Sequence, residues 1–597
     1  MPRFRPPLSP ATGSGRRRSA ARVARALSPR GALALHSVDG ALSFALRAAL
    51  AMALPAVPMA VAGRADLAVY TMLGSFTTTF GRNLPYPRRA RVLALVALAM
   101  TACVGCGSAL GAWARPQDGG AGAAVVVAAT ALVAGLAKFA CDAARLSGLG
   151  AVLLLFSFAV AANGSPVPSD VLPHTGLAAL GAAVAWVLGV AGRLVHPDRP
   201  QRLAVAAALR ELAALLDVVG AGDAARASHG PARHRATAAV LQAYGTLGLL
   251  PPTSDERAGR AGRSGRGDVC VRLTDLSWSL LTGAARRPPD DPAVLAGHLR
   301  VQVRLLVSRR VRDPELLPEL AGPTSAAEAE AEPAPSGPTT RPAAELRAAE
   351  LVTGRSHGGH GRTAVLLVPA LRMVLGTGIA GGAALALGLG HGYWAAISAA
   401  AVLHSINVRT AAQRAVQRTL GTVAGLLLAL GVLAAEPGPV VLVLVIVLLE
   451  FLLEYVVARN YGLGVVFLTP LALLLSDLAA PAPAGALVQD RALSSVLGIA
   501  VALLCALVVV HDHAALRAEH ALAACTQAGR RAERALEDGA EATYPILQTR
   551  LAAAVVELRE ADDAAAGELW PAEIDPIELA AAEQRAYLLL ERLAQGR

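Results

Sequence analysis

Charged residues and lysine are scarce in this 597-residue chain. Only 17% of the residues are charged and 54% are hydrophobic, and every basic residue is an arginine except Lys138. A typical soluble domain has about 25% charged residues, so this chain has too little polar surface to cover an ordinary water-soluble core. The composition therefore predicts a polytopic membrane protein and excludes one made only of soluble domains.

The sequence also lacks the usual signatures of a metal site or an enzyme. Cys103 and Cys106, two of only six cysteines, form a C-x-x-C inside an apolar run without a second pair. We find no phosphate-binding loop, no H-E-x-x-H and no nucleophile with its base. The formal charge of +11 lies beside apolar stretches rather than on a patch interleaved with aromatics. We therefore expect no metal, no cofactor, no catalysis and no nucleic-acid partner.

Twelve apolar stretches are candidate membrane spans, six in the first third of the chain and six near the end. A span needs roughly 20 mostly apolar residues to cross the hydrocarbon core. The second and the eighth are short, which predicts steep, broken or interfacial helices. The candidates are 43–62, 67–81, 92–113, 121–139, 147–163, 175–193, 364–388, 391–407, 416–434, 438–456, 461–477 and 491–510.

Arginines gather on alternate loops, as the positive-inside rule requires of cytoplasmic loops. This places both termini in the cytoplasm and leaves the outside loops nearly free of basic residues. The inside loops hold Arg82, Arg88, Arg89, Arg91, Arg409, Arg414, Arg418 and Arg459, and the outside ones hold Arg64, Arg115 and, at a span boundary, Arg491.

The expected fold is an all-α polytopic membrane protein with two homologous six-span halves and cytoplasmic helical domains. The segments between the spans show apolar residues at helical spacing, whereas two other stretches are of low complexity. The expected parts are a basic arm (1–40), a first transmembrane half (41–194), a helical domain (195–322), a linker (323–362), a second transmembrane half (363–510) and a C-terminal helical domain (511–597).

An internal repeat supports the two halves. Residues 70–91 align with 393–414 without a gap, and each copy follows an apolar span that contains a Leu-Arg pair. Repeats of this kind are common in transporters. The aligned identities are Tyr70 with Tyr393, Ser75 with Ser398, and Arg91 with Arg414, and the pairs are Leu46-Arg47 and Leu371-Arg372.

The stretch 390–425 resembles the fusaric acid resistance (FUSC) family of membrane transporters, which includes aromatic acid exporters. The similarity is good over 364–510 and weaker over 41–193, where the Trp and the Gly-Thr-x-x-Gly are missing. It implies export of aromatic carboxylates or similar amphiphiles. The matching residues are Tyr393-Trp394, Ser398, Arg414, Arg418, Gly421-Thr422 and Gly425, followed by Arg459, Asn460, Tyr461, Thr469 and Pro470.

Arginines and aromatic rings suit such a substrate. A guanidinium holds a carboxylate bidentately, so Arg91, Arg414 and Arg418 are candidates to bind the carboxylate, with Arg91 and Arg414 attracting it from the cytoplasm. Tyr393 and Trp394 offer faces for a ring, and Ser398 is a further candidate. The alternative is that the arginines, Arg418 among them, are positive-inside anchors and the aromatics an interfacial belt. The topology places the aromatics near the outer surface and the arginines near the inner one, so we expect them to serve different ends of a pathway.

Titratable groups inside the spans are candidates for proton coupling. Glu450 and Glu454 share a helix face, and two carboxylates close together in low dielectric raise at least one pKa. Ion pairing with nearby Arg459 is the alternative for these two, and packing is the alternative for His404.

Arg47 and Arg372 lie in or near the start of apolar spans, where a charge is costly unless it pairs or snorkels. Either arginine is therefore a functional candidate, with snorkelling to the inner interface as the alternative.

The sequence therefore predicts a secondary-active efflux transporter in the plasma membrane that exports organic carboxylates, in particular aromatic ones, or related toxic compounds. Coupling to protons is a further hypothesis. The expected partners are the lipid bilayer, a small organic anion and, as possibilities, a second copy or an accessory efflux subunit. Two alternatives stay open: an anion channel-like conduit, and a non-transporting scaffold or envelope-stress protein.

Overall fold

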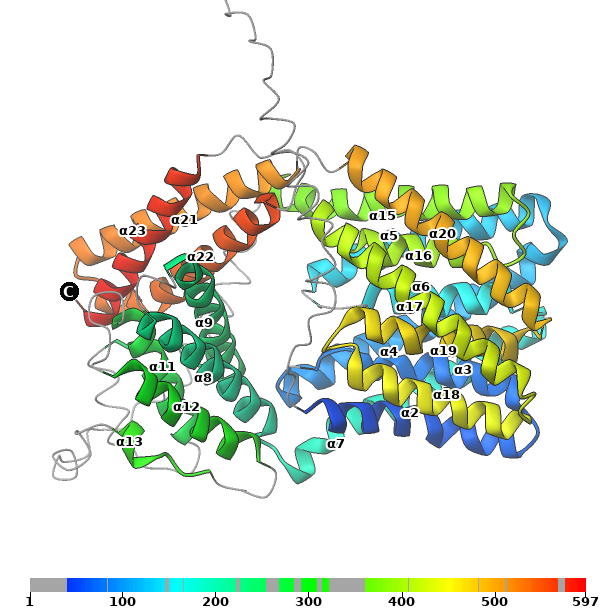
Figure 1. Cartoon of the computed structure of the whole chain (residues 1–597), viewed down its shortest axis with the longest axis horizontal. Coiled ribbons are helices and arrows are strands. Elements are labelled where there is room, and N and C mark those ends of the chain that lie inside the picture. Colours follow the sequence, from blue (N-terminus) through cyan, green and yellow to red (C-terminus); the bar gives the residue numbers. More distant parts are fainter. Residues whose placement is uncertain are drawn as a thin grey trace, which may run out of the picture.

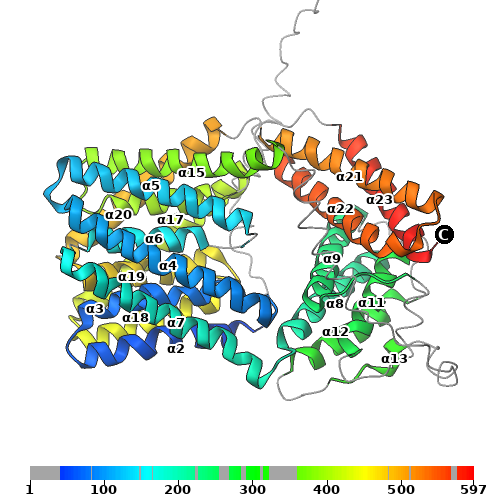
Figure 2. The same cartoon turned by 180° about the vertical axis from the view of Figure 1, so that it is seen from behind.

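The computed structural model describes residues 40–596 except 83, 145, 147–149, 165, 222–225, 254–267, 284–290, 309–313, 322–359, 406, 482, 510–512 and 567–574. The expected basic arm (1–40) and linker (323–362) lie almost wholly outside these residues. The described part consists of an apolar helical bundle and a polar helical bundle that lie side by side (Figures 1 and 2).

The apolar bundle contains two groups of six helices that are separated in the sequence. The first group is α2 (Ala41–Val61), α3 (Ala65–Ser75), α4 (Tyr86–Ala114), α5 (Gly120–Ala143), α6 (Gly150–Asn163) and α7 (Val171–Val195). The second group is α15 (His360–Ala386), α16 (Tyr393–Leu403), α17 (Val408–Ala434), α18 (Pro439–Val456), α19 (Tyr461–Ala479) and α20 (Ala484–Val509).

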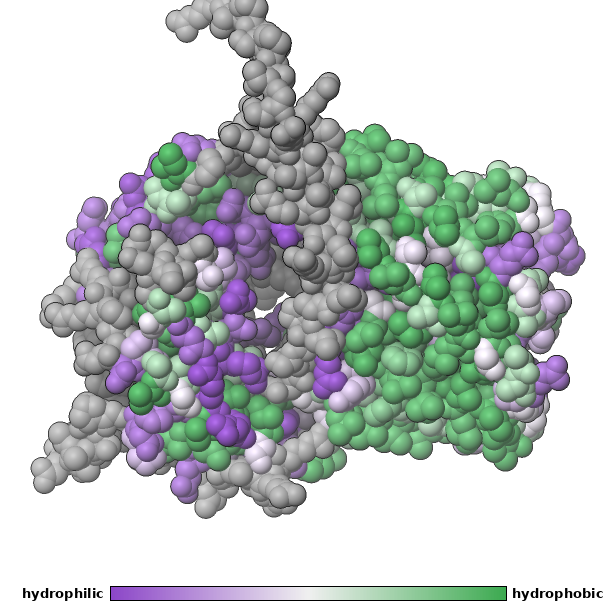
Figure 3. All heavy atoms as spheres, in the orientation of Figure 1, coloured by the Kyte–Doolittle hydropathy of each residue, from purple (hydrophilic) through white to green (hydrophobic). Residues whose placement is uncertain are grey.

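Nine of the described helices are long and apolar enough to cross a membrane: α2, α4, α5, α7, α15, α17, α18, α19 and α20. Their outer faces expose large apolar side chains such as Leu98, Leu136 and Leu427. This gives the bundle the continuous hydrophobic surface of Figure 3, as expected where lipid tails are the solvent.

The three remaining helices of the apolar bundle are short and buried. The expected span at 147–163 is not among the nine: within the described residues α6 has 14 residues and, at 1.5 Å per residue, is about 21 Å long, against a hydrocarbon core of about 30 Å. Helices α3 and α16 have 11 residues each, in agreement with the expectation of short helices there. Every residue of α16 is buried, so protein rather than lipid surrounds it.

The two groups pack on each other through reciprocal pairs of helices. Helix α2 packs along α18, and α5 packs along α15. Gly135 of α5 lies so close to α15 that an added Cβ would be 2.3 Å from Val374 Cγ2. One hydrophobic core therefore runs through both groups.

The polar bundle consists of helices from two distant parts of the chain. Its helices are α8 (Arg199–Gly220), α9 (Arg226–Leu247), α11 (Asp268–Gly283), α12 (Pro292–Val307), α13 (Pro318–Ala321), α21 (His513–Glu537), α22 (Tyr544–Ala566) and α23 (Pro576–Gln595). They share one hydrophobic core. The indole N–H of Trp278 donates to Gln548 Oε1 at 2.8 Å, and the hydroxyls of Thr237 and Tyr587 are 3.1 Å apart. The segments expected as two domains thus form one packed unit.

Candidate anion-binding site

Helix α16 brings two aromatic side chains into the interior of the second helix group. The Tyr393 hydroxyl donates to Ser476 Oγ of α19 at 3.2 Å. The Trp394 ring is 2% exposed, with its centroid 4.9 Å from that of Tyr393 and 5.8 Å from that of Phe156 of α6. Both expected aromatic residues therefore lie inside the bundle, not in a belt on its surface.

Arg491 of α20 lies on the face of Trp394. Its guanidinium carbon is 3.8 Å from the centroid of the indole, a cation–π geometry. The side chain is 1% exposed, and its Nε and Nη1 have no hydrogen-bond partner. The sequence pattern predicts Arg491 at a span boundary beside an outside loop, whereas the structure shows that it is buried.

Arg418 of α17 also approaches α16. Its Nη2 is 3.4 Å from Ser398 Oγ and its Nη1 is 3.4 Å from the Tyr461 hydroxyl, both near the limit for a hydrogen bond. The side chain is 1% exposed and its Nε has no partner. Because Ser398 is one helical turn from Trp394, the expectation that arginines and aromatics lie at different ends of a pathway is wrong for Arg418.

Neither arginine has an acidic partner among the described residues. The nearest acid in sequence, Asp490, accepts a hydrogen bond from His391 Nδ1 at 2.9 Å instead. The two guanidinium groups contact α16 one helical turn apart, Arg491 at Trp394 and Arg418 at Ser398. Burying an uncompensated charge costs several kcal/mol, so this region is electrostatically incomplete without an anion.

Hydroxyl groups add further donors on the same helices. The side-chain oxygens of Ser494 and Ser495 on α20 and of Thr422 on α17 are buried and have no partner. Buried polar groups are nearly always hydrogen-bonded. Three hydroxyls and two arginines without full partners are consistent with a ligand that accepts hydrogen bonds.

A close helix crossing fixes the geometry of the site. An added Cβ on Gly498 of α20 would be 2.3 Å from the Ala395 carbonyl oxygen and 2.9 Å from Ser398 Cβ. Only glycine permits this approach, which places Arg491, two turns earlier on α20, against Trp394.

The other expected arginines lie elsewhere. Arg414, one turn before Arg418, is half-buried, with its guanidinium carbon 5.6 Å from the Tyr461 ring and its Nη1 without a partner. Arg91 is exposed on α4, and no described contact brings it to Arg414. Arg372 donates to the Leu403 and Ser405 carbonyl oxygens at 2.8 Å each. These bonds satisfy backbone groups at the end of α16.

The two glutamates face the first helix group. Glu454 is ion-paired with Arg82, which follows η2 (Phe76–Thr79), rather than with Arg459, which lies over Tyr455 at 4.0 Å. Glu450, one turn away, is 1% exposed, and its Oε2 has no partner.

Arg47 and His404 complete the expected residues. The Arg47 guanidinium carbon is 5.3 Å from the centroid of the Phe44 ring, and the Arg82 guanidinium carbon is 3.8 Å from the same centroid. Arg47 therefore belongs to the neighbourhood of the glutamate pair. His404 Nδ1 is buried without a partner. Proton coupling by Glu450, Glu454 or His404 stays a prediction.

Comparisons with known proteins agree with the resemblance seen in the sequence. Residues 379–505 match the family described as "Fusaric acid resistance protein-like". A relative named "Uncharacterized membrane protein YvaC", from Bacillus subtilis (strain 168), is 26% identical over 475 residues, which cover 76% of this chain and 71% of that protein. No solved structure matches. The matched segment contains Trp394, Arg418 and Arg491, so the site described above lies in the family-like part of the chain.

Proposed function

We propose that this membrane protein, whose residues 379–505 match the fusaric acid resistance protein-like family, is a secondary-active exporter of organic, preferentially aromatic, carboxylates. One observation carries the proposal. Arg418 and Arg491 are buried side by side with Trp394 and have no acidic partner among the described residues. A carboxylate supplies the missing negative charge, and two guanidinium groups bind it with charge-assisted hydrogen bonds.

The aromatic preference follows from the surroundings of the arginines. Arg491 occupies one face of Trp394, and the rings of Tyr393 and Phe156 lie within 6 Å of it. An aromatic acid that enters this region places its carboxylate at the guanidinium groups and its ring among these side chains, where offset and edge-to-face contacts are favourable.

The two groups of six helices are interpreted as homologous halves. In support, the first helix of each group packs on the fourth helix of the other: α2 on α18, and α15 on α5. Helices α3 and α16, second in their groups, are equally short. Since the arginine pair lies in the second half only, the binding site is asymmetric.

Proton coupling is assigned to Glu450. Its carboxylate is buried where the halves meet, and one oxygen lacks a partner, whereas Glu454 is held by Arg82. We further assign the chain to the plasma membrane, with the polar bundle and both termini in the cytoplasm, because arginines accumulate on that side.

Retention of labelled aromatic acids in intact cells tests this function. Cells that express the chain lose a preloaded acid faster than empty cells, and Arg418→Gln at equal membrane level abolishes the difference. Arg193→Gln, at an exposed position at the end of α7, is the matched control and retains export. If no acid leaves faster than from empty cells, aromatic export is wrong and the scaffold alternative gains. If loss persists without a proton gradient, the chain is a channel-like conduit.

A further inference from the structure

A buried histidine lies outside the proposed transport site, in the first helix group. His174 is in the first turn of α7 and is 5% exposed. Its ring is stacked on that of Tyr70 of α3, with the two centroids 3.5 Å apart and an angle of 13° between the planes. Tyr70 is 3% exposed. We call these two residues the His174–Tyr70 pair.

The helices that carry this pair cross as α16 and α20 do in the second group. In each group the sixth helix packs on the short second helix: α7 on α3, and α20 on α16. A glycine makes each crossing close. An added Cβ on Gly181 of α7 would overlap the Thr71 carbonyl oxygen, as one on Gly498 of α20 would overlap that of Ala395.

His174 and Arg491 occupy matching places at these two crossings. Each lies two turns before the glycine of its helix, and each lies on the face of an aromatic ring of the short helix. The rings match within one position, because the repeat aligns Tyr70 with Tyr393, the neighbour of Trp394. His174 is therefore the residue of the first group that stands where the second group has Arg491.

The two residues differ in what gives them a charge. The Arg491 guanidinium is charged at every physiological pH, whereas the imidazole of His174 is charged only when it is protonated. An aromatic face attracts a cation. The first group thus contains a cation–π pair only when His174 has bound a proton.

The hydrogen-bond partner of His174 suits both forms of the ring. Nδ1 of His174 lies 3.3 Å from Oγ of Ser108 on α4, and Ser108 is fully buried. A serine hydroxyl both donates and accepts, and it rotates to suit its partner. It can donate to the neutral ring or accept from the protonated one, so a change of protonation leaves neither group without its bond.

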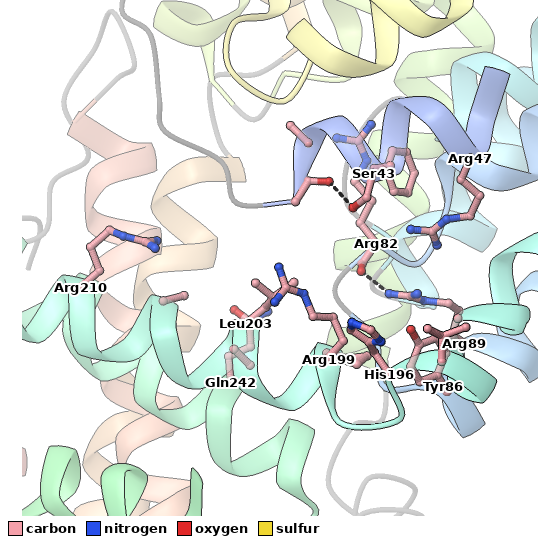
Figure 4. A pocket seen from close by; sticks show the side chains of 18 residues that line it. Ser43, Arg47, Arg82, Tyr86, Arg89, His196, Arg199, Leu203, Arg210 and Gln242 are labelled. Atoms are coloured by element: carbon pink, nitrogen blue, oxygen red, sulfur yellow. Dashed lines mark hydrogen bonds between the residues drawn. The ribbon is translucent and has the colours of Figure 1, made fainter. Parts of the chain in front are cut away.

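The other charged and titratable groups on the surrounding elements fall into two sets. Those at the same end of the bundle are Arg64, Asp66, Cys106, Arg115, Asp170 and Asp477. Asp66 is exposed and lies 3.9 Å from Arg64, and Asp170 accepts a hydrogen bond from the Val167 N–H at 3.0 Å. The second set lies at the opposite ends of α2, α4 and α7, where Figure 4 shows Arg47, Arg89 and His196.

We propose that His174 is a proton-binding residue of the first helix group, and that its protonation creates there the cation–aromatic pair that Arg491 and Trp394 form permanently in the second. The proton comes from water at the nearby end of the bundle and returns to it, because His174 lies close to the end of a candidate span. The effect on export rests on the proposed function: the added positive charge attracts the exported anion.

Titration of the intact chain in detergent, with isotope-labelled histidine and NMR detection, tests proton binding directly. The signal of His174 is the one that is missing from the spectrum of His174→Gln. His174→Phe, which keeps a ring on Tyr70, checks this assignment. We expect the signal to move from the neutral to the charged position as the pH falls from about 8 to about 5. A His174 signal that stays at the neutral position overturns the proposal.

A second measurement tests whether the charge at this position acts on export. Exchange of labelled for unlabelled benzoate is followed in proteoliposomes with the same pH on both sides, after subtraction of the leak through protein-free vesicles. We expect the rate of the intact chain to fall at least about threefold as the pH rises from about 6 to about 8. His174→Arg, charged throughout, keeps the high rate, and His174→Gln keeps the low one.

The control and the contrary outcomes separate this proposal from the proposed function. His196→Gln, just after the other end of α7, retains the pH dependence of the intact chain. An equal fall in His174→Arg refutes the role of His174 in export. Absence of exchange at every pH refutes the proposed function instead, and the NMR titration still decides whether His174 binds a proton.

Discussion

Arg491 and Trp394 form a buried cation–π pair, with the guanidinium carbon 3.8 Å from the indole centroid and, among the described residues, no acidic side chain to balance the charge. The pair joins α20 to α16, and Arg418 approaches α16 one turn further along, at Ser398. Two cations packed against a short helix inside an apolar bundle are stable only if the surroundings supply negative charge. The proposed carboxylate supplies it during transport.

Removing one of these cations stabilises the empty protein. Arg491→Gln eliminates a charge whose burial is uncompensated, so we expect the free energy of unfolding to rise by roughly 3 kcal/mol. The measurement is thermal unfolding in detergent, in a buffer whose anions are bulky sulfonates. Benzoate raises the midpoint of the intact chain and leaves that of the variant unchanged. A variant less stable than the intact chain contradicts an empty anion site.

Proton coupling depends on the carboxyl group of Glu450. Glu450→Gln keeps its size and hydrogen-bonding capacity but cannot ionise. We expect export by the variant to become independent of an imposed proton gradient, while exchange of labelled for unlabelled acid persists. Both are measured in proteoliposomes. Export that still follows the gradient assigns coupling elsewhere, with His404 the next candidate.

Glu454 forms the ion pair with Arg82, and a substitution of Glu454 tests what this pair contributes to stability. Glu454→Gln breaks the ion pair with Arg82 and leaves a guanidinium group, whose side chain is 23% exposed, without its partner. Loss of one partner of a buried pair costs about 3–5 kcal/mol, so the thermal midpoint falls. An unchanged midpoint excludes the ion pair as a link between the two helix groups.

The close crossing of α16 and α20 predicts a strong effect of a single methyl group. Gly498→Ala places Cβ 2.3 Å from the Ala395 carbonyl oxygen, so the helices separate at a cost of roughly 1–3 kcal/mol, and transport falls because Arg491 moves away from Trp394. Gly485→Ala is the control on the same helix, because nothing lies within 4 Å of its added Cβ. Equal stability and activity in the two variants contradict the described packing.

The polar bundle contains a group whose titration affects stability. Burial raises the pKa of Glu583, although Arg559, 3.8 Å away, and Arg233 oppose the shift. A carboxyl group with a raised folded-state pKa stabilises the fold below its unfolded-state pKa, and this stabilisation is lost as the pH rises through the folded-state pKa. We therefore expect exchange in α22 and α23 to slow, after correction for intrinsic rates, as the pH falls through this interval.

Glu583→Gln flattens this dependence and slows exchange at neutral pH. The matched control is Glu578→Gln, at an exposed position of the same helix, which leaves the pH dependence as it is. A steeper dependence in Glu583→Gln refutes the assignment.

Much of the architecture could be predicted because each span contains its own signal in apolar length and flanking arginines. The family resemblance at 390–425, the short helix α16 and the separation of apolar from polar segments all follow from local patterns. The apolar run of the 14-residue helix α6 is typical of a membrane helix, and only the packing around it shows that protein covers it.

The contacts that build the site could not be predicted, because they join residues far apart in the chain. Arg491 meets Trp394 across nearly a hundred positions, and Arg82 meets Glu454 across 372. The one local signal for Arg491 is an arginine beside an apolar run that contains Ser494 and Ser495. That pattern alone is equally typical of a span boundary. The shared core of the polar bundle could not be predicted for the same reason, because its helices come from two distant parts of the chain.

Saturable binding of labelled benzoate to the purified intact chain tests the central claim most directly. The variants Arg418→Gln, Arg491→Gln and Arg193→Gln are measured beside it at the same protein concentration. We predict that each of the first two variants weakens binding at least about tenfold, the effect of about 1.4 kcal/mol, and that Arg193→Gln binds as the intact chain does. Equal affinity in all four proteins would contradict a carboxylate site between Arg418 and Arg491.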